Sequence, residues 1–290
     1  MTSEQKIKPL FPLKPRKKPA QLLQHIAREQ VIEDGYVFRA FDTFPLADMD
    51  TPQNDWGLED LPEMEWLQNV HNFYSGKRTF MLGTGPSLAT QQHLLAPLQH
   101  EDTWTVNRMR RWYEQGQLPF TPTHHIVTEP GPCTWWGKMI EPRYDFPEAK
   151  NRIAVNWWPV TSPGWLWCPK APDDIQIRWQ GMFGFDDDLP PLPTGWASPL
   201  TGSQLAYWMG YDTVYFLGID TTQEGQAWDP ILGRTLRPRQ IRSILDCFER
   251  AAREVKRHGR QIYDCTPGGR INQEGILEYR DLEEVLHASS

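Results

Sequence analysis

The chain has 290 residues, a formal net charge of −7 and four cysteines. This length allows a substantial core, in one large domain with extensions or in two small ones, and the negative balance excludes a global basic field that would recruit nucleic acid. The sequence shows no apolar core of signal-peptide type and no stretch approaching about 18 apolar residues, so we expect a soluble, cytoplasmic protein. The cysteines are scattered without a C-x-x-C pair, which indicates free thiols in a reducing compartment.

Residues 1–75 form a polar, proline-interrupted N-terminal extension, in which we expect helices around Ala20–Glu33 and Glu63–Tyr74. The extension opens with a basic arm, whose cations are Lys6, Lys8, Lys14, Arg16, Lys17 and Lys18. Four prolines interrupt these cations and predict an extended conformation. The arm either contacts nucleic acid or another anionic surface, or is an ordinary solvated tail.

A second domain is expected over residues 76–290, where short β-rich runs alternate with helical stretches. The runs are Thr79–Leu82, Thr103–Val106, His125–Thr128, Arg152–Trp157, Ile175–Trp179, Thr213–Leu217 and Gln261–Asp264. The clearest helices are Ser203–Met209 and Pro238–His258, and the second has apolar residues at helical spacing along one face. This alternation predicts an α/β fold with a mostly parallel sheet and helices on both faces.

Residues 129–197 have a different composition, rich in tryptophan and proline. We interpret this segment as a lid insertion beside a ligand crevice, in which two or three tryptophans stack on sugar rings or nucleobases. Its acidic run, Asp186–Asp188, either holds Mg²⁺ or is a solvated loop.

The turn that follows the first predicted strand, Gly83-Thr84-Gly85-Pro86-Ser87, has the pattern of a strand handing over to a helix. Glycines permit positive φ and close approach of a ligand, and proline suits the first helical position. Free N–H groups and the helix dipole would then favour an anion, usually phosphate. The alternative is a strand–turn–helix without a ligand.

Small polar residues also follow the other predicted strands, and in an open parallel sheet ligands bind beyond the carboxyl ends of the strands. Besides Gly83–Ser87, they are Asn107 and Arg108, Thr128 and Glu129, Gly218 and Asp220–Thr222, Thr266–Arg270, and the turn Thr201-Gly202-Ser203 before a predicted helix. Their convergence predicts a nucleotide-like ligand.

Three of the charged groups near this edge allow more than one interpretation. Asp220 either binds a metal such as Mg²⁺, accepts a ribose hydroxyl, or caps a turn, and Glu129 is either a base or a helix cap. Arg234, Arg237, Arg239 and Arg242 surround the start of the long helix, where they either form a solvated helix start or bind an anionic partner. We favour the anionic partner, because the helix dipole disfavours cations at that end.

The block Leu82-Gly83-Thr84-Gly85-Pro86-Ser87-Leu88 resembles the Gly-x-Gly-Pro-Ser-Leu signature of bacterial CMP-sialic-acid-dependent sialyltransferases and of the related MptE-like diphosphokinases. Four further blocks agree in order: Asn107, Thr201–Ser203, Met209–Asp220 and Tyr263–Gly269. The resemblance implies a Rossmann-like domain in which the Gly83–Ser87 and Gly202–Ser203 turns, with Asn107, Thr201, Gly218, Asp220, Thr266 and Gly268, hold the nucleotide.

The chain also departs from this family. The sialyltransferases carry a histidine base before the long helix, whereas residues 228–235 contain none, and Arg234 falls about where the histidine would be. A base for an acceptor hydroxyl would therefore come from Glu129, Asp220 or Asp229.

Three functions are compatible with these features. The first is a glycosyltransferase that uses a nucleotide sugar such as a CMP- or UDP-sugar. The second is an MptE-like diphosphokinase that uses ATP and Mg²⁺. The third is a transferase that modifies nucleic acid, docked through the basic arm. We favour the first.

Overall fold

The structure is a computed structural model, and it describes residues 30–33, 36–39, 65–128, 140, 142–156, 162–169, 197–221, 227 and 238–288. The chain divides into two units, Met1–Pro62 and Glu63–Ser290.

The described part of the first unit is an antiparallel pair of strands, β1 (Gln30–Glu33) and β2 (Tyr36–Arg39), with Gln30 opposite Arg39. The expected helix over Ala20–Glu33 is therefore wrong at its carboxyl end. Valine, isoleucine and aromatic residues favour strands, and the intervening Asp-Gly pair is typical of a two-residue hairpin loop.

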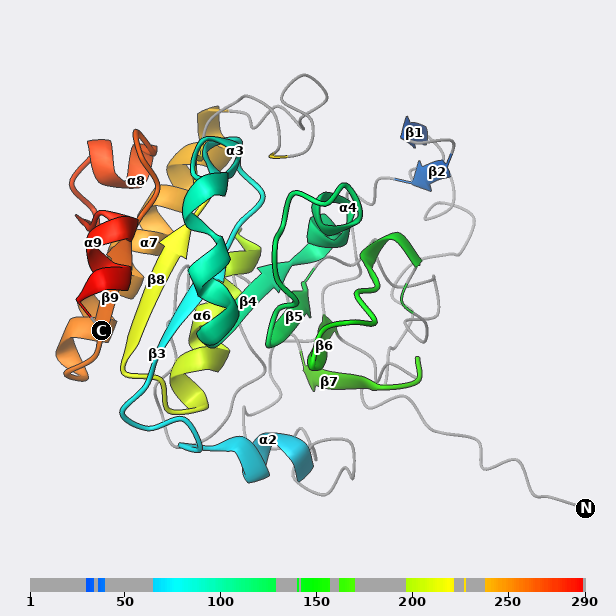
Figure 1. Ribbon diagram of the computed structural model, residues 1–290, viewed down its shortest axis with the longest axis horizontal. Helices are drawn as coiled ribbons and strands as arrows, with labels where there is room; N and C mark the ends of the chain where they lie inside the picture. Colours follow the sequence, from blue (N-terminus) through cyan, green and yellow to red (C-terminus); the bar gives the residue numbers. More distant parts are fainter. Residues whose placement is uncertain are drawn as a thin grey trace, which may run out of the picture. The chain divides into compact units, whose positions relative to one another are not determined.

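The second unit is built on an eight-stranded sheet of order β10-β9-β8-β3-β4-β5-β6-β7, in which every neighbouring pair is parallel (Figure 1). The strands are β3 (Arg78–Leu82), β4 (Thr103–Val106), β5 (His124–Val127), β6 (Asn151–Asn156), β7 (Trp165–Pro169), β8 (Thr213–Leu217), β9 (Gln261–Asp264) and β10 (Glu278–Tyr279). The predicted parallel sheet is confirmed. Strands β7 and β10 were not predicted, and the run expected at Ile175–Trp179 lies outside the described residues.

Helices α6 (Ser198–Trp208) and α7 (Pro238–Arg257) cover one face of the sheet. A Cβ on Gly202 of α6 would lie 2.9 Å from Met81 Cε on β3, and Phe248 of α7 makes an edge-on ring contact with Phe216 on β8, at 5.3 Å between centroids. Register pairs Met81 with Phe216, so both side chains point to this face.

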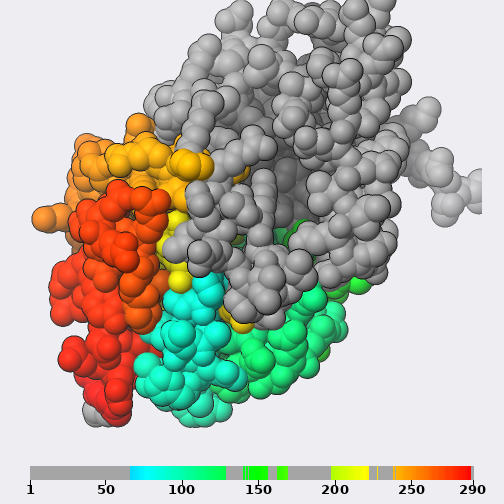
Figure 2. Space-filling model, turned by 90° about the horizontal axis from the view of Figure 1, so that it is seen from above, coloured from blue at the N-terminus to red at the C-terminus, as the bar shows by residue number. Residues whose placement is uncertain are grey.

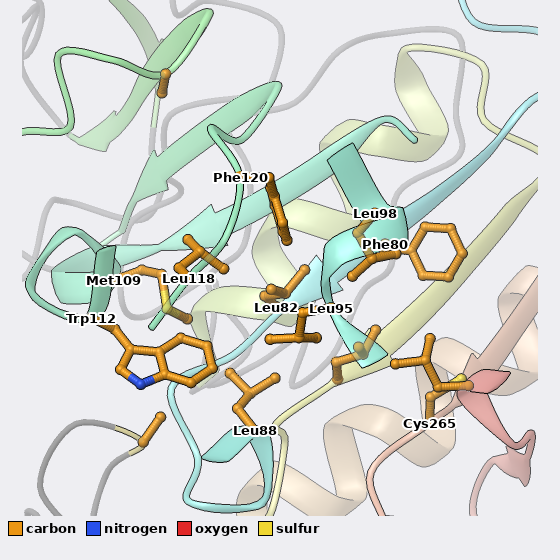
Figure 3. Close-up of a cluster of buried hydrophobic side chains, with 14 of the residues drawn as sticks. Phe80, Leu82, Leu88, Leu95, Leu98, Met109, Trp112, Leu118, Phe120 and Cys265 are labelled. Carbon is orange, nitrogen blue, oxygen red and sulfur yellow. The ribbon is translucent and has the colours of Figure 1, made fainter. Parts of the chain in front are cut away.

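The opposite face carries the short helices α3 (Ser87–Thr90), α4 (Arg110–Glu114) and α9 (Leu282–His287), with the 3₁₀ turns η2 (Gln92–Leu94), η3 (Ala96–His100) and η4 (Asn107–Met109). Figure 3 shows the apolar cluster beneath them, which contains Phe80 and Leu82 from β3 together with Leu88, Leu95 and Trp112. Helices on both faces of a parallel sheet make this an α/β, Rossmann-like fold.

Smaller elements complete the unit: α2 (Glu65–Val70), η5 (Pro142–Tyr144) and α8 (Arg270–Gln273). Helix α2 lies within the expected Glu63–Tyr74 helix and is joined to α6 by a hydrogen bond from Trp208 Nε1 to the Leu67 carbonyl, at 3.1 Å. None of the described helices is long and apolar enough to cross a membrane.

The order of the strands places a topological switch point between β3 and β8. The chain leaves β3 through α3 on one face of the sheet and returns in β4, which pairs with one side of β3. Strand β8 pairs with the other side of β3, and the chain leaves it toward α7 on the opposite face. Loops that leave adjacent strands toward opposite faces open a crevice at the carboxyl edge, which is where ligands bind in such sheets. Figure 2 looks onto this edge, with the turn after β3 in cyan next to the loop after β8 in yellow.

Candidate functional site

The Gly83–Ser87 turn is joined to the loop that follows β8. The Gly83 amide donates to the Leu217 carbonyl at 2.8 Å, and the Gly85 amide donates to the Gly218 carbonyl at 2.9 Å. Neither Gly83 nor Gly85 has positive φ, which differs from the sequence-based expectation. Space explains these glycines instead, because a Cβ on Gly85 would overlap the Asp220 carboxylate and lie 2.6 Å from the Gly218 carbonyl oxygen.

Asp220 occupies the position predicted for a phosphate at the start of α3. Its carboxylate accepts hydrogen bonds from the Ser87 hydroxyl at 2.7 Å and from the Ser87 amide at 3.2 Å. Burial raises the pKa of Asp220, while the two hydrogen bonds from Ser87 act in the opposite direction. The positive end of α3 therefore interacts with a carboxylate of the chain itself.

This pairing leaves Thr84 as the residue of the turn whose amide is available to a ligand. The amides of Gly83, Gly85 and Ser87 are all engaged, and Pro86 has none. The Thr84 carbonyl accepts from the Ala227 amide at 2.9 Å, and within the described residues its own amide has no partner. A ligand at this turn would meet the amide and hydroxyl of one threonine, beside the Asp220 carboxylate.

The loop after β8 is held from the β9 side. Thr266 is buried, and its hydroxyl accepts a hydrogen bond from the Ile219 amide at 3.1 Å. The Arg270 amide donates to the Asp220 carbonyl at 3.2 Å. Gly218 and Thr221 have φ of +66° and +50°, so the loop is sharply bent on both sides of Asp220. Gly268 lies in an exposed turn, with φ of +67°.

Asp264, the last residue of β9, is a buried carboxyl group that the sequence reasoning did not select. It has no exposed surface, and its Oδ1 accepts the Thr266 amide at 2.9 Å, while Oδ2 has no partner within the described residues. Burial raises its pKa to about 6, hydrogen bonds from Thr266 oppose this shift, and the charge of Asp220 adds to it. The sequence signal that could have identified Asp264 is its position at the end of the predicted strand Gln261–Asp264.

A second polar cluster joins the ends of β4 and β5 to the start of α6. Asn107 has φ of +48°, and its Nδ2 donates to Ser198 Oγ at 2.8 Å. The Thr128 hydroxyl donates to the same Ser198 oxygen at 2.5 Å, and its amide donates to Asn107 Oδ1 at 3.4 Å. The structure thus brings together the strand-end residues Asn107 and Thr128, and adds Ser198, which the sequence reasoning missed.

Thr201, Gly202 and Ser203 do not form a turn at the start of a helix. Helix α6 begins at Ser198, and these three residues are buried in its interior, where the Ser203 hydroxyl donates to the Leu200 carbonyl at 2.7 Å. The expected start at Ser203 is therefore wrong. Pro199 lies in the first turn, where proline is tolerated, and Gly202 lets α6 lie close to Met81 and Ile126.

Several predicted groups lie outside the described residues: Glu129, Asp229, Arg234, Arg237, the run Asp186–Asp188, the basic arm, and most of the lid. Arg242 in α7 forms an ion pair with Asp246 at 2.9 Å, so the anionic partner of this arginine is a carboxylate of the chain itself. No group of three or more acidic, histidine or cysteine side chains suited to a metal occurs in the described ranges.

Comparison with known proteins adds one structural likeness. Neither a family description nor a curated protein matches the sequence. Among solved structures, the chain is similar to one described as the MAf glycosyltransferase from Magnetospirillum magneticum AMB-1, with a TM-score of 0.44 and 14% sequence identity. The alignment covers 78% of this chain and 41% of that one, so this chain spans less than half of that protein.

Proposed function

We propose that this protein is a glycosyltransferase that binds a nucleotide sugar at the carboxyl edge of the sheet, beside the Gly83–Ser87 turn and the loop after β8. The observation that carries the proposal is the convergence of polar strand ends at the switch point. Asp220 and Ser87 are in contact there, and Asn107, Thr128 and Ser198 form the second polar cluster. This is the position at which nucleotides bind in open parallel sheets.

The two polar clusters suit different parts of a nucleotide. The Asp220 carboxylate repels phosphate but accepts a hydrogen bond from a ribose hydroxyl, with Thr84 beside it. Helix α6 has 11 residues and directs its positive end toward the edge that carries Asn107, which favours the phosphates on that side. The sequence resemblance to nucleotide-sugar transferases supports a sugar as the transferred group.

The base that would deprotonate an acceptor hydroxyl is proposed among Glu129, Asp220 and Asp229. Burial raises the pKa of Asp220, which brings a carboxyl group closer to the range of an effective base. Arg234 is proposed to balance charge on the leaving nucleotide, because a guanidinium is a fixed fork of donors.

A thermal-shift panel of CMP, UDP, GDP and ATP, each with and without Mg²⁺, tests this function. A ligand at 100 times its Kd stabilises the folded state by about 2.7 kcal/mol, which raises Tm by several degrees in a chain of this size. We expect CMP or UDP to give the largest shift. Stabilisation by ATP with Mg²⁺ alone would support the diphosphokinase instead, and a panel without any shift would overturn nucleotide binding.

A pair of matched variants locates the site. Asn107→Gly removes the side-chain amide from the second polar cluster and keeps a residue that accepts φ of +48°. We expect it to reduce nucleotide affinity at least tenfold. The control is Asn72→Gly, because Asn72 has φ of +57° but is exposed. Equal affinities in the two variants would place the nucleotide elsewhere.

A further inference from the structure

Hydrogen bonds, together with the covalent link between Ile219 and Asp220, connect β9 to the start of α3 through the loop after β8. Asp264 accepts the Thr266 amide, the Thr266 hydroxyl accepts the Ile219 amide, and Ile219 precedes Asp220, which accepts both donors of Ser87. This connection spans three neighbouring strands of the sheet, β9, β8 and β3. Asp264 lies at its buried end.

We propose that Asp264 is a positioning residue of this loop: by accepting the Thr266 amide, its carboxylate holds Thr266 where the Thr266 hydroxyl accepts the Ile219 amide, and so keeps Asp220 against Ser87. The Asp264 carboxylate accepts the Thr266 amide at 2.9 Å, and the Thr266 hydroxyl accepts the Ile219 amide at 3.1 Å. Thr266 therefore links the end of β9 to the loop after β8.

The loop needs this support because its bends are unfavourable on their own. Thr221 has φ of +50°, a conformation that costs free energy for a β-branched residue. The Gly85 amide anchors the loop at Gly218 from one side, and Thr266 anchors it at Ile219 from the other. With both anchors in place, Asp220 has little freedom to leave Ser87.

The charge of Asp264 controls how well the network holds. Burial raises the pKa of Asp264 to about 6, so the carboxyl group changes charge close to neutral pH. When it is protonated it becomes a weaker acceptor for the Thr266 amide, and Thr266 then supports the Ile219 contact less firmly. The titratable and charged groups around Asp264 are Asp220 from the loop after β8, Cys265 next in the chain, and Tyr279, Arg280 and Asp281 beside β9.

A role of Asp264 in catalysis rests on the proposed function. The hydrogen-bond network itself can be tested without a ligand. The experiment follows the backbone amide resonances of Thr266, Ile219 and Ser87 by ¹H–¹⁵N NMR between pH 8 and pH 4.5 in the full chain. We expect all three amides to shift with a common midpoint near pH 6. In Asp264→Asn this step should disappear from Ile219 and Ser87.

Two further variants separate transmission through Thr266 from a general effect of charge. Thr266→Val removes the hydroxyl and keeps Asp264, so the amide of residue 266 should still report the step while Ile219 and Ser87 lose it. This variant also serves if Asp264→Asn does not fold. The control is Asp281→Asn, a substitution at the N-cap of α9 that retains the cap and should leave the step unchanged. A step at Ser87 that survives in Asp264→Asn or in Thr266→Val would overturn the inference.

Discussion

The glycines at the switch point lack a Cβ and thereby let the loop after β8 pack closely against the turn after β3. Gly83 and Gly85 follow β3 without positive φ, and a Cβ on either would collide with the loop after β8. A Gly-x-Gly pattern is commonly associated with a ligand that approaches the backbone. In this chain the group that approaches closely is Asp220, together with the Gly218 carbonyl.

The substitution Gly85→Ala tests this close approach. Because its Cβ would meet a backbone carbonyl and a half-buried carboxylate, we expect the free energy of unfolding of the ligand-free protein to fall by about 3 kcal/mol. Urea unfolding measures it. Gly116→Ala is the matched control, because Gly116 is exposed, has φ of +71°, and has no atom near its Cβ position, so the strain there is about 1 kcal/mol. Equal losses would show that the two loops do not pack as described.

At the scale of an element, α6 shows why a buried helix is difficult to delimit from sequence. Nearly all of its residues are buried, so the apolar stripe that reveals an amphipathic helix such as α7 is missing. Pro199 and Gly202 are both poor helix formers and indicated a turn. Gly202 is instead a packing residue at the point where α6 crosses β3 and β5.

A graded series at Gly202 tests this role. In Gly202→Ala the new methyl group meets the flexible end of Met81, and the gain in helix propensity of about 1 kcal/mol offsets the crowding, so we expect little change in stability. Gly202→Val adds bulk toward Met81 and Ile126 and should cost about 3 kcal/mol. Thermal unfolding followed by circular dichroism compares them. If valine were tolerated as well as alanine, α6 would not lie as close to the sheet as described.

At the scale of the whole molecule, the apolar runs of the central sheet were the most predictable feature. Thr103–Val106, Thr213–Leu217 and Gln261–Asp264 are strands with the predicted bounds, because each run contains the β-branched and aromatic residues that favour strands. Strand β7 was missed because its tryptophans and proline resemble the irregular segment around it. The partnership of Asp220 with Ser87 was missed because it joins residues 133 positions apart, which no local pattern indicates.

The buried histidines of β5 make acid stability a property of the whole sheet. His124 stacks on Trp104, and His125 donates through Nε2 to the Tyr144 carbonyl at 2.9 Å. Burial lowers the pKa of His124 to about 3 and that of His125 to about 4. Unfolded histidine has a pKa near 6.5, so the unfolded state binds more protons, and stability is lost as pH falls through 6.5 toward 4.

Asp264 acts in the opposite direction, because its pKa is raised in the folded state and the folded chain takes up its proton first. We expect the net free energy of unfolding to fall by roughly 4 kcal/mol between pH 7 and pH 4, measured by urea unfolding at each pH. The fall should be smaller in His125→Gln and larger in Asp264→Asn. A flat profile in the wild-type chain would contradict the burial of both rings.

The position of β8 beside β3 also has a consequence for synthesis on the ribosome. Strand β3 finds β4 within a few tens of residues, but its other edge stays unpaired until the chain has grown through Thr213–Leu217. During that interval a central, apolar strand is exposed to solvent and to other nascent chains, which makes the growing chain prone to aggregation. Folding of this protein in the cell is therefore expected to depend on translation speed and on chaperones that shield that edge.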